Sequence, residues 1–380
     1  EHGSRVEGGV AKELLRASEK LGVVACPTGV LMTGSGELNV ADQGLGDDDA
    51  CVLAEVLTRC TQKLTKIDVA RNGLGDRGIC ALLATVHKSS GPTLKSLDLG
   101  GNAAASARAG LALSALMKEA LGGLRTLVIT GLRLGPEGWR DLSEAIQYQP
   151  LVELGVADTG LHGALATQVA PALVMGRGLQ RLDLGWNSLG VSAFEALGEA
   201  LAGSSLIELN VVSTATRAGR HPHEYASILH LIEKLPAARA LTFVDLSHNR
   251  LQASGGLLLG EVVVASRIER LVVSGNPLGA LGLRYLLRVL LGRDAAGSLQ
   301  CNDVSTAQRE DPAALFPGNP SGAVCLDLSL PHHRGAMRLV VRRCEELGLV
   351  PAEALKGLQL QGRSWAPADA GAVPQAGVVA

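Results

Sequence analysis

Aromatic residues are almost missing from this 380-residue chain: Phe, Trp and Tyr together make up 2% of it, although hydrophobic residues as a whole reach 47%. A core of this size has to be built from Leu, Val, Ile and Ala. No run of about 18 apolar residues occurs, which excludes an ordinary membrane-spanning helix. The N-terminus has none of the apolar core of a signal peptide. It begins with Glu1 rather than Met, which favours a piece of a longer protein.

An excess of charge of either sign is also missing. Lys and Arg total 35, Asp and Glu total 37, and the formal net charge is −2, so nothing favours binding to nucleic acid or to an anionic membrane. The seven cysteines include no C-x-x-C pair, which argues against both a disulfide framework and a zinc site. No Asn-x-Ser/Thr glycosylation acceptor occurs either. These absences favour a reducing, cytoplasmic location, and we expect no cofactor or metal.

Glycine, with 47 residues, is abundant, and leucine recurs in a fixed order. The phrase L-x-x-L-x-L-x-x-N-x-L is clearest from Leu179 to Leu189. Copies that follow one another by 30, 30, 27, 28, 27, 35 and 27 residues begin at Leu64, Leu94, Leu124, Leu151, Leu179, Leu206, Leu241 and Ile268. Weaker copies lie at 38–45, 326–328 and 355–360. Agreement at several offsets in so many copies is strong evidence for a repeat architecture.

Each copy predicts a short strand, a turn and a helix. Leu182 and Leu184 are two residues apart and therefore share one face of a strand, while Asp183 faces the other way. Asn187 follows at the turn, where its amide can satisfy neighbouring backbone groups. Three copies replace this Asn with other residues: Leu132, Thr159 and Thr214. Those turns are expected to be less rigid, and a segment with helical periodicity follows each turn.

This pattern resembles the leucine-rich-repeat family. The period near 28 residues is similar to that of the ribonuclease-inhibitor-like subclass, which includes the repeat domains of NOD-like receptors and Ran GTPase-activating protein. The resemblance covers roughly nine-tenths of the chain. It implies an α/β solenoid, a curved horseshoe with parallel strands on the concave face and helices on the convex face. Strands pack about 4.8 Å apart and helices about 8–10 Å apart, and this mismatch bends the array.

The repeat divides the chain into three segments. Residues 1–34 are predicted to form an N-terminal helix and cap, residues 35–362 the solenoid, and residues 363–380, which have no period, a disordered tail. Two insertions interrupt the solenoid, near 213–225 and 293–322. A cluster in and beside the first insertion consists of His221, His223, Glu224 and His230. Its spacing matches no established metal site, so a solvated loop is predicted there.

The outward-facing strand positions line the expected concave face and supply candidate contact residues. Four of the candidates are acidic and two are basic: Asp68, Asp98, Asp183, Asp245, Arg181 and Arg270. One interpretation is a surface that selects a partner carrying basic groups. The other is that Asp is simply common in the repeat consensus, so that the row is an ordinary solvated face.

The position just before the turn Asn supplies four further candidates: Arg71, Asp158, Trp186 and His248. None of the copies has a plain apolar residue there, which predicts that this position faces solvent. An exposed Trp186 is a hot-spot candidate for binding, and the alternative is a Trp packed on its neighbours. Trp139 has the same offset as Ile79 and Phe194 and is predicted to lie in the helix core.

These features predict a non-enzymatic scaffold that binds a partner protein through the concave face and the strand–turn edge, as the interaction arm of a larger protein. No nucleophile elbow, Walker loop or H-E-x-x-H motif occurs. The alternative is a GTPase-activating protein resembling the Ran activator. That activity needs a polar residue presented from the strand–turn edge to a nucleotide site, for which Arg71, Asn72 and Asn102 are the candidates. The acidic C-terminal tail of that family is missing here.

Overall fold

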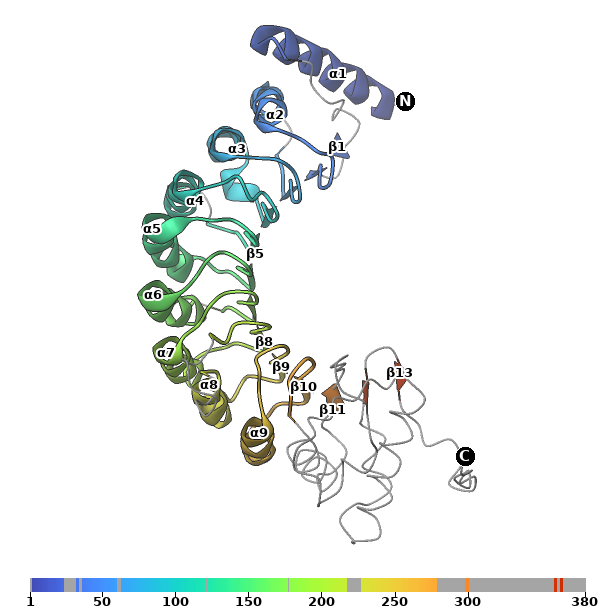
Figure 1. Ribbon diagram of the computed structural model, residues 1–380. Helices are drawn as coiled ribbons and strands as arrows, with labels where there is room; N and C mark the ends of the chain where they lie inside the picture. Colours follow the sequence, from blue (N-terminus) through green and yellow to red (C-terminus); the bar gives the residue numbers. More distant parts are fainter. Residues whose placement is uncertain are drawn as a thin grey trace, which may run out of the picture.

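The computed structural model describes residues 2–23, 32–33, 36–59, 63–119, 122–176, 178–216, 227–278, 298–300, 359–360 and 363–364. In this part of the chain, short strands follow one another along the inner side of an arc, and helices cover its outer side (Figure 1). The predicted α/β leucine-rich-repeat solenoid is therefore confirmed. No helix among the described residues is both long and apolar enough to cross a bilayer.

The inner side of the arc is one sheet whose strands follow in chain order. Its members are β1 (Met32–Thr33), β2 (Glu37–Asn39), β3 (Lys66–Asp68), β4 (Ser96–Asp98), β5 (Thr126–Val128), β6 (Glu153–Gly155), β7 (Arg181–Asp183), β8 (Glu208–Asn210), β9 (Phe243–Asp245), β10 (Arg270–Val272) and β11 (Ser298–Gln300). β1 pairs antiparallel with β2, and from β2 onward each strand pairs in parallel with the next. Equivalent residues of neighbouring repeats are therefore in register across the sheet. A separate hairpin joins β12 (Gln359–Leu360) and β13 (Arg363–Ser364).

The helices are α1 (His2–Leu21), α2 (Asp47–Arg59), α3 (Asp76–Ser89), α4 (Ala107–Glu119), α5 (Gly135–Tyr148), α6 (Gly163–Val174), α7 (Val191–Leu201), α8 (Leu229–Lys234) and α9 (Ala253–Ala265), with short 3-10 turns η2 (Gly91–Thr93) and η3 (Leu235–Ala237). Helices α2 to α9 lie on the outer side of the arc, and α1 lies across its N-terminal end (Figure 1). Local sequence favours several of the starts. Three Asp residues open α2, where they suit the helix dipole, and Pro136 opens α5, where its missing N–H costs nothing.

The core runs without a break between the sheet and the helices. The middle residue of each strand from β2 to β10 is buried, and Leu182 is a typical case at 2% exposure. Asp183, beside it, is only partly buried, so the predicted facing of the strand is confirmed. The two largest side chains of the core, Trp139 and Phe194, are fully buried at equivalent places in α5 and α7. The sequence prediction for Trp139 is therefore confirmed.

Helix α1 covers the N-terminal end of the core. Ala17 of α1 packs against Val52 and Val56 of α2 in a small apolar cluster. At its margin, Arg59 donates to Glu13 at 2.6 Å, and Lys20 donates to Glu55 at 2.9 Å. A terminal repeat has no neighbour on one side, so an amphipathic helix that shields its apolar residues acts as a cap.

The turn asparagines join each repeat to the one before it. The Asn187 carboxamide oxygen accepts the backbone N–H groups of Thr159 and Leu161, both at 3.1 Å, from the preceding repeat. Its NH₂ group donates to the carbonyls of Val156 and Leu184, both at 2.9 Å. The same pattern recurs at the buried residues that we call the asparagine ladder: Asn72, Asn102, Asn187, Asn249 and Asn276.

The three turns without Asn are built in two ways. The Thr159 hydroxyl donates to Val156 at 2.8 Å, and the Thr214 hydroxyl donates to Val211 at 2.7 Å, so each keeps a bond to a carbonyl of its own repeat. Leu132 can supply no such bond, and its buried side chain adds to the core instead. The lower rigidity expected at these turns stays a prediction.

Several expectations fall wholly or partly on residues outside the described ranges. Residues 217–226, which make up most of the first insertion and contain His221, His223 and Glu224, lie outside them. The second insertion and the C-terminal tail also lie outside them, apart from β11 and β13.

The asparagine ladder generates a stability prediction. Asn187→Ala removes the acceptor of two buried N–H groups and the donor to the Leu184 carbonyl, and each unsatisfied group costs about 1–3 kcal/mol. We expect the free energy of unfolding to fall by more than about 3 kcal/mol. Asn187→Thr should lose less, because Thr159 and Thr214 show that a hydroxyl can bond the strand carbonyl at this position. Urea denaturation of both variants measures the difference, and equal losses would contradict the role of the amide.

Candidate functional site

A row of residues with left-handed backbone conformation runs along the edge of the sheet. It occupies the position just before the turn in each repeat, and we call it the ledge. Its members have φ between 50° and 81°: Asp42, Arg71, Gly101, Gly131, Asp158, Trp186, Ser213, His248 and Gly275. Each backbone N–H of Arg71, Trp186 and His248 donates at 2.7 Å to a carbonyl of the next repeat. The backbone of the ledge is thus fixed by the fold, while its side chains vary from repeat to repeat.

Trp186 has the largest side chain on the ledge. A left-handed conformation is comfortable for Gly and tolerated by Asn and Asp, but it is unusual for a bulky side chain. Trp186 nevertheless adopts φ 57°, and its side chain is 63% exposed. The predicted solvent-facing position is confirmed. Because local backbone preference disfavours Trp here, and burial does not require it, the fold itself does not account for this residue.

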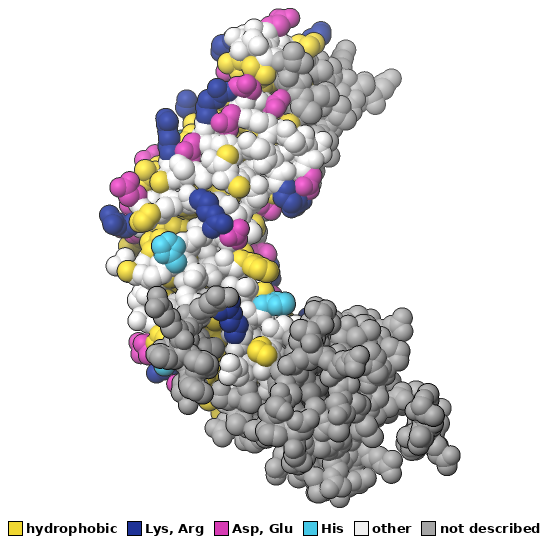
Figure 2. All heavy atoms as spheres, viewed as in Figure 1, with side chains coloured by type: hydrophobic (Ala, Val, Ile, Leu, Met, Phe, Trp, Pro, Cys, Tyr) yellow, Lys and Arg dark blue, Asp and Glu magenta, His cyan; other side chains and the backbone are white. Residues whose placement is uncertain are grey.

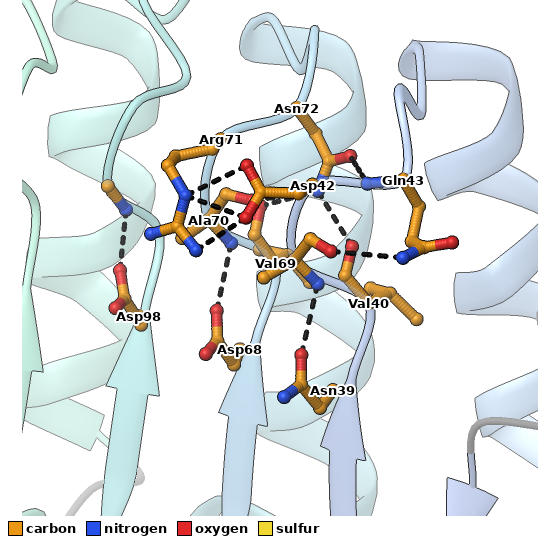
Figure 3. A network of polar contacts seen from close by, with 12 residues as sticks. Asn39, Val40, Asp42, Gln43, Asp68, Val69, Ala70, Arg71, Asn72 and Asp98 are labelled. Atoms are coloured by element: carbon orange, nitrogen blue, oxygen red, sulfur yellow. Dashed lines mark hydrogen bonds and ion pairs between the residues drawn. The ribbon is translucent and has the colours of Figure 1, made fainter.

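Arg71 does not stand free on the ledge. Its Nε donates to both carboxylate oxygens of Asp42 at 2.8 Å, and its Nη2 donates to Oδ2 at 2.6 Å (Figure 3). Both side chains remain mostly exposed. The hydrogen bond with Arg71 lowers the pKa of Asp42, and the hydrogen bond with Asp42 raises the pKa of Arg71. Sequence analysis missed this pair because Asp42 belongs to the most degenerate copy of the repeat.

Three other charged candidates also have internal partners. Asp158 accepts from Arg133 at 2.7 Å, and Arg181 donates to Glu153 on the neighbouring strand at 2.9 Å. The guanidinium of Arg270 lies 5.1 Å from the ring centroid of Phe243. These contacts are made at the surface, so the groups stay accessible to a partner while their charge is partly compensated. His248 is exposed on the ledge, and its ring lies over Gly275 in the next repeat.

The four aspartates of the concave row share a structural task. Asp68, Asp98, Asp183 and Asp245 each accept the backbone N–H two residues ahead, at 3.1, 2.8, 2.9 and 2.9 Å respectively. Asn39 and Asn210 do the same at the equivalent positions of their repeats. These side chains thus fix the ends of β2, β3, β4, β7, β8 and β9 before the ledge, as Figure 3 shows for Asn39, Asp68 and Asp98. In the sequence, Asn39 and Asn210 stand where other repeats have Asp. This replacement indicates that the position needs a hydrogen-bond acceptor and does not need a charge.

The aspartates differ in their electrostatic surroundings. Burial raises the pKa of Asp98, an effect opposed by the Gly100 N–H and by the nearby cations Arg71 and Lys66. Burial also raises the pKa of Asp183, where the Gly185 N–H opposes it, and the carboxylate of Asp245 raises it further. The negative charge of Asp183 is therefore held in a desolvated place without the cations that surround Asp98.

The concave face and the ledge offer side chains suited to contact with another molecule. Within the described ranges, no group of three or more His, Cys, Asp or Glu residues is arranged to hold a metal ion. Figure 2 shows charges of both signs over the outer helices, and acidic, apolar and histidine side chains close to one another at the inner edge of the arc. The arrangement can hold another molecule by aromatic, charged and hydrogen-bonding contacts.

Comparison with known proteins supports the repeat assignment. A family model described as Leucine Rich repeat matches residues 61–83 and 238–260. The first matched segment contains β3 and the start of α3, and the second contains β9 and the start of α9. Taken with the parallel sheet and its covering helices, these matches support the leucine-rich-repeat fold of the described residues.

Solved structures with some likeness include actin-binding site 2 of leiomodin-1, with 16% identity and a TM-score of 0.30 over 43% of this chain and 87% of that one. Another is the yeast complex of Rad7 and Elc1, with 15% identity and a TM-score of 0.26 over 72% of this chain and 90% of that one. Nothing about the partners of this chain follows from either. A search of curated proteins by sequence finds no match.

The desolvated charge of Asp183 generates a pH prediction. Its pKa is raised in the folded state, so the folded protein binds the proton more tightly than the unfolded chain does. Stability therefore falls as pH rises from the unfolded pKa, about 3.9, through the folded value. Asp183→Asn keeps the acceptor for Gly185 and removes the charge. We expect this variant to be more stable than the wild type at pH 7.

Urea melts at pH 3 and pH 7 test this prediction, because the advantage of Asp183→Asn should be absent at the lower pH. Asp183→Ala is the matched control. It removes the same charge but also the hydrogen bond, which is worth about 1 kcal/mol, so it should be less stable than Asp183→Asn at both pH values. An Asp183→Asn variant that is less stable than the wild type at pH 7 would overturn the electrostatic account.

The two tryptophans generate a second stability prediction. Trp139→Ala should lower the free energy of unfolding by about 3–5 kcal/mol, because it empties a buried site. Trp186→Gly should stay within about 1 kcal/mol of the wild type, since relief of the left-handed conformation offsets the greater chain entropy of Gly. Denaturation followed by circular dichroism compares the variants. Comparable large losses from both would show that Trp186 is part of the core.

Proposed function

We propose that the chain is a non-enzymatic interaction module that binds a partner protein through the concave face and the ledge. The repeat length and the full helix in most repeats support placing it in the ribonuclease-inhibitor-like subclass, and the lack of a C-x-x-C pair in the sequence supports a cytoplasmic setting. The contact residues we propose are those that the sequence singled out on these two rows: Asp68, Arg71, Asp98, Asp158, Arg181, Asp183, Trp186, Asp245, His248 and Arg270.

The observation that carries this proposal is the exposed Trp186. A Trp on a rigid backbone presents a large apolar surface that loses little conformational entropy on binding, and Trp is enriched among the residues that dominate binding energy. The position is fixed by the backbone bond from Trp186 to Val212 at 2.7 Å, and Asn187 immediately after it is anchored in the asparagine ladder. The indole is thus preorganised for contact even though the local conformation favours smaller residues.

The alternative of a GTPase-activating protein has less support. Asn72 and Asn102 are buried and bonded within the asparagine ladder, so reaching a nucleotide would break the turns that they hold. Arg71 is accessible but already paired with Asp42. Stimulated GTP turnover that is lost in Arg71→Ala and retained in Trp186→Ser would favour this alternative.

Binding to the native partner provides the main test. We expect Trp186→Ser to weaken binding by about 2 kcal/mol or more, roughly 30-fold in Kd, because the ring is removed while Ser, as at Ser213, fits the ledge. The partner is first recovered by affinity purification from the native source, and its Kd is then measured by calorimetry.

The matched control is Tyr148→Ser, at the C-terminal end of α5, because Tyr148 is 68% exposed against 63% for Trp186. This control should leave the Kd within about twofold of the wild-type value. A wild-type Kd for Trp186→Ser, or an equal loss in Tyr148→Ser, would remove the ledge from the interface.

A further inference from the structure

The concave face between β6 and β9 has more carboxylates than its own cations can neutralise. Its outward strand positions carry Glu153, Asp183, Glu208 and Asp245 against the single cation Arg181, which pairs with Glu153 at 2.9 Å. Within the described part of the chain, no Lys or Arg forms an ion pair with the other three. Two of these, Asp183 and Asp245, are partly buried, and Glu208 is exposed.

The N-terminal part of the same face is compensated differently. Asp68 and Asp98 lie within electrostatic reach of Arg71, and Lys66 also acts on Asp98. The aspartate at the strand end is common to both regions because it caps the strand. In the middle of the arc, by contrast, no Lys or Arg of the described residues forms an ion pair with Asp183 or Asp245. The repeat pattern explains why an aspartate is present at these positions, but it does not explain why a cation is absent beside them.

The carboxylates without an ion pair lie close, in the chain and in the sheet, to the position of Trp186 on the ledge. Asp183, Asn210 and Asp245 are in register on neighbouring strands, which places the two carboxylates about 10 Å apart with an amide between them. Trp186 follows Asp183 by three residues. A Cβ on the intervening Gly185 would lie 3.1 Å from an Asp183 oxygen and 3.8 Å from the Asn210 amide oxygen. The carboxylate, the amide and the start of the Trp186 backbone therefore meet at one place.

The face already shows how an aromatic ring here can hold a cation. On β9, the ring of Phe243 is covered by the guanidinium of Arg270 at 5.1 Å, a cation–π contact across two strands. Trp is a better cation acceptor than Phe. Among the described residues no cation covers Trp186, although its side chain is 63% exposed.

We propose that Trp186, Asp183 and Asp245 form a site for a cationic side chain, Arg or Lys, carried by a basic segment of the protein partner. This inference rests on the proposed function and names the chemistry of its partner. The cation would lie against the indole while its charge is met by carboxylates that have no internal cation. An Arg would present several donors to these carboxylates at once.

The test uses the full chain and a defined probe, an acetylated and amidated nona-arginine peptide, titrated by calorimetry at about 50 mM salt, where exposed charges are weakly screened. We expect Trp186→Ser and the double variant Asp183→Asn with Asp245→Asn each to weaken peptide binding by about tenfold or more. A nona-citrulline peptide, which is close in shape but uncharged, should not bind measurably.

The matched control removes two exposed carboxylates from the outer helices, Glu137→Gln with Glu199→Gln. It changes the net charge as much as the concave double variant and should weaken binding less than about twofold. Equal losses in both double variants, comparable binding of the citrulline peptide, or no binding to the wild type would overturn the cationic site. The proposed function would still stand if the native partner depended on Trp186, so the two failures are distinguishable.

Discussion

Buried hydrogen bonding between successive turns is the constraint on which the rest of the solenoid depends. Each inner strand has only three residues in the structure, as β7 (Arg181–Asp183) does, so strand pairing alone leaves many backbone groups of the following turn without partners. The Asn187 amide satisfies those groups in two repeats at once. The apolar strand residues can then be buried without leaving unsatisfied N–H or C=O groups beside them.

The same constraint creates the surface on which binding is proposed. Once Asn187 is anchored and the Asp183 carboxylate caps the strand end, the three residues between them are fixed in position. Trp186 is therefore held in the left-handed region by what surrounds it rather than by its own preference. A position whose backbone is fixed and whose side chain is unused by the core can change from Gly to Arg, His or Trp without altering the fold. This separation lets one architecture present different surfaces.

The repeat period in the sequence predicted those features that occur at the same position in every repeat. The strand centres such as Leu182, the buried Trp139 and the exposed Trp186 all follow from offsets within one copy. The contacts between unlike residues of neighbouring copies could not be predicted in the same way. The pairing of Arg71 with Asp42 depends on two side chains that occur together only once. The desolvation of Asp183 depends on how neighbouring strands and turns pack around it, which the sequence does not show. The sequence did indicate that this position accepts a hydrogen bond, because other repeats have Asn there.

At Leu132, where the asparagine ladder is interrupted, neighbouring repeats are joined by contacts on both the inner and the outer side of the solenoid. Leu132 contributes apolar area but no amide on the inner side. On the outer side of the same junction, a Cβ on Gly110 of α4 would lie 3.1 Å from the Cα of Gly138 in α5, so the two helix backbones meet there without intervening side chains. Repeats contact only their neighbours, so the stability of each junction depends on local contacts. Close backbone packing between α4 and α5 adds dispersion contacts at this junction, and it needs glycine at positions where a helix alone would favour alanine.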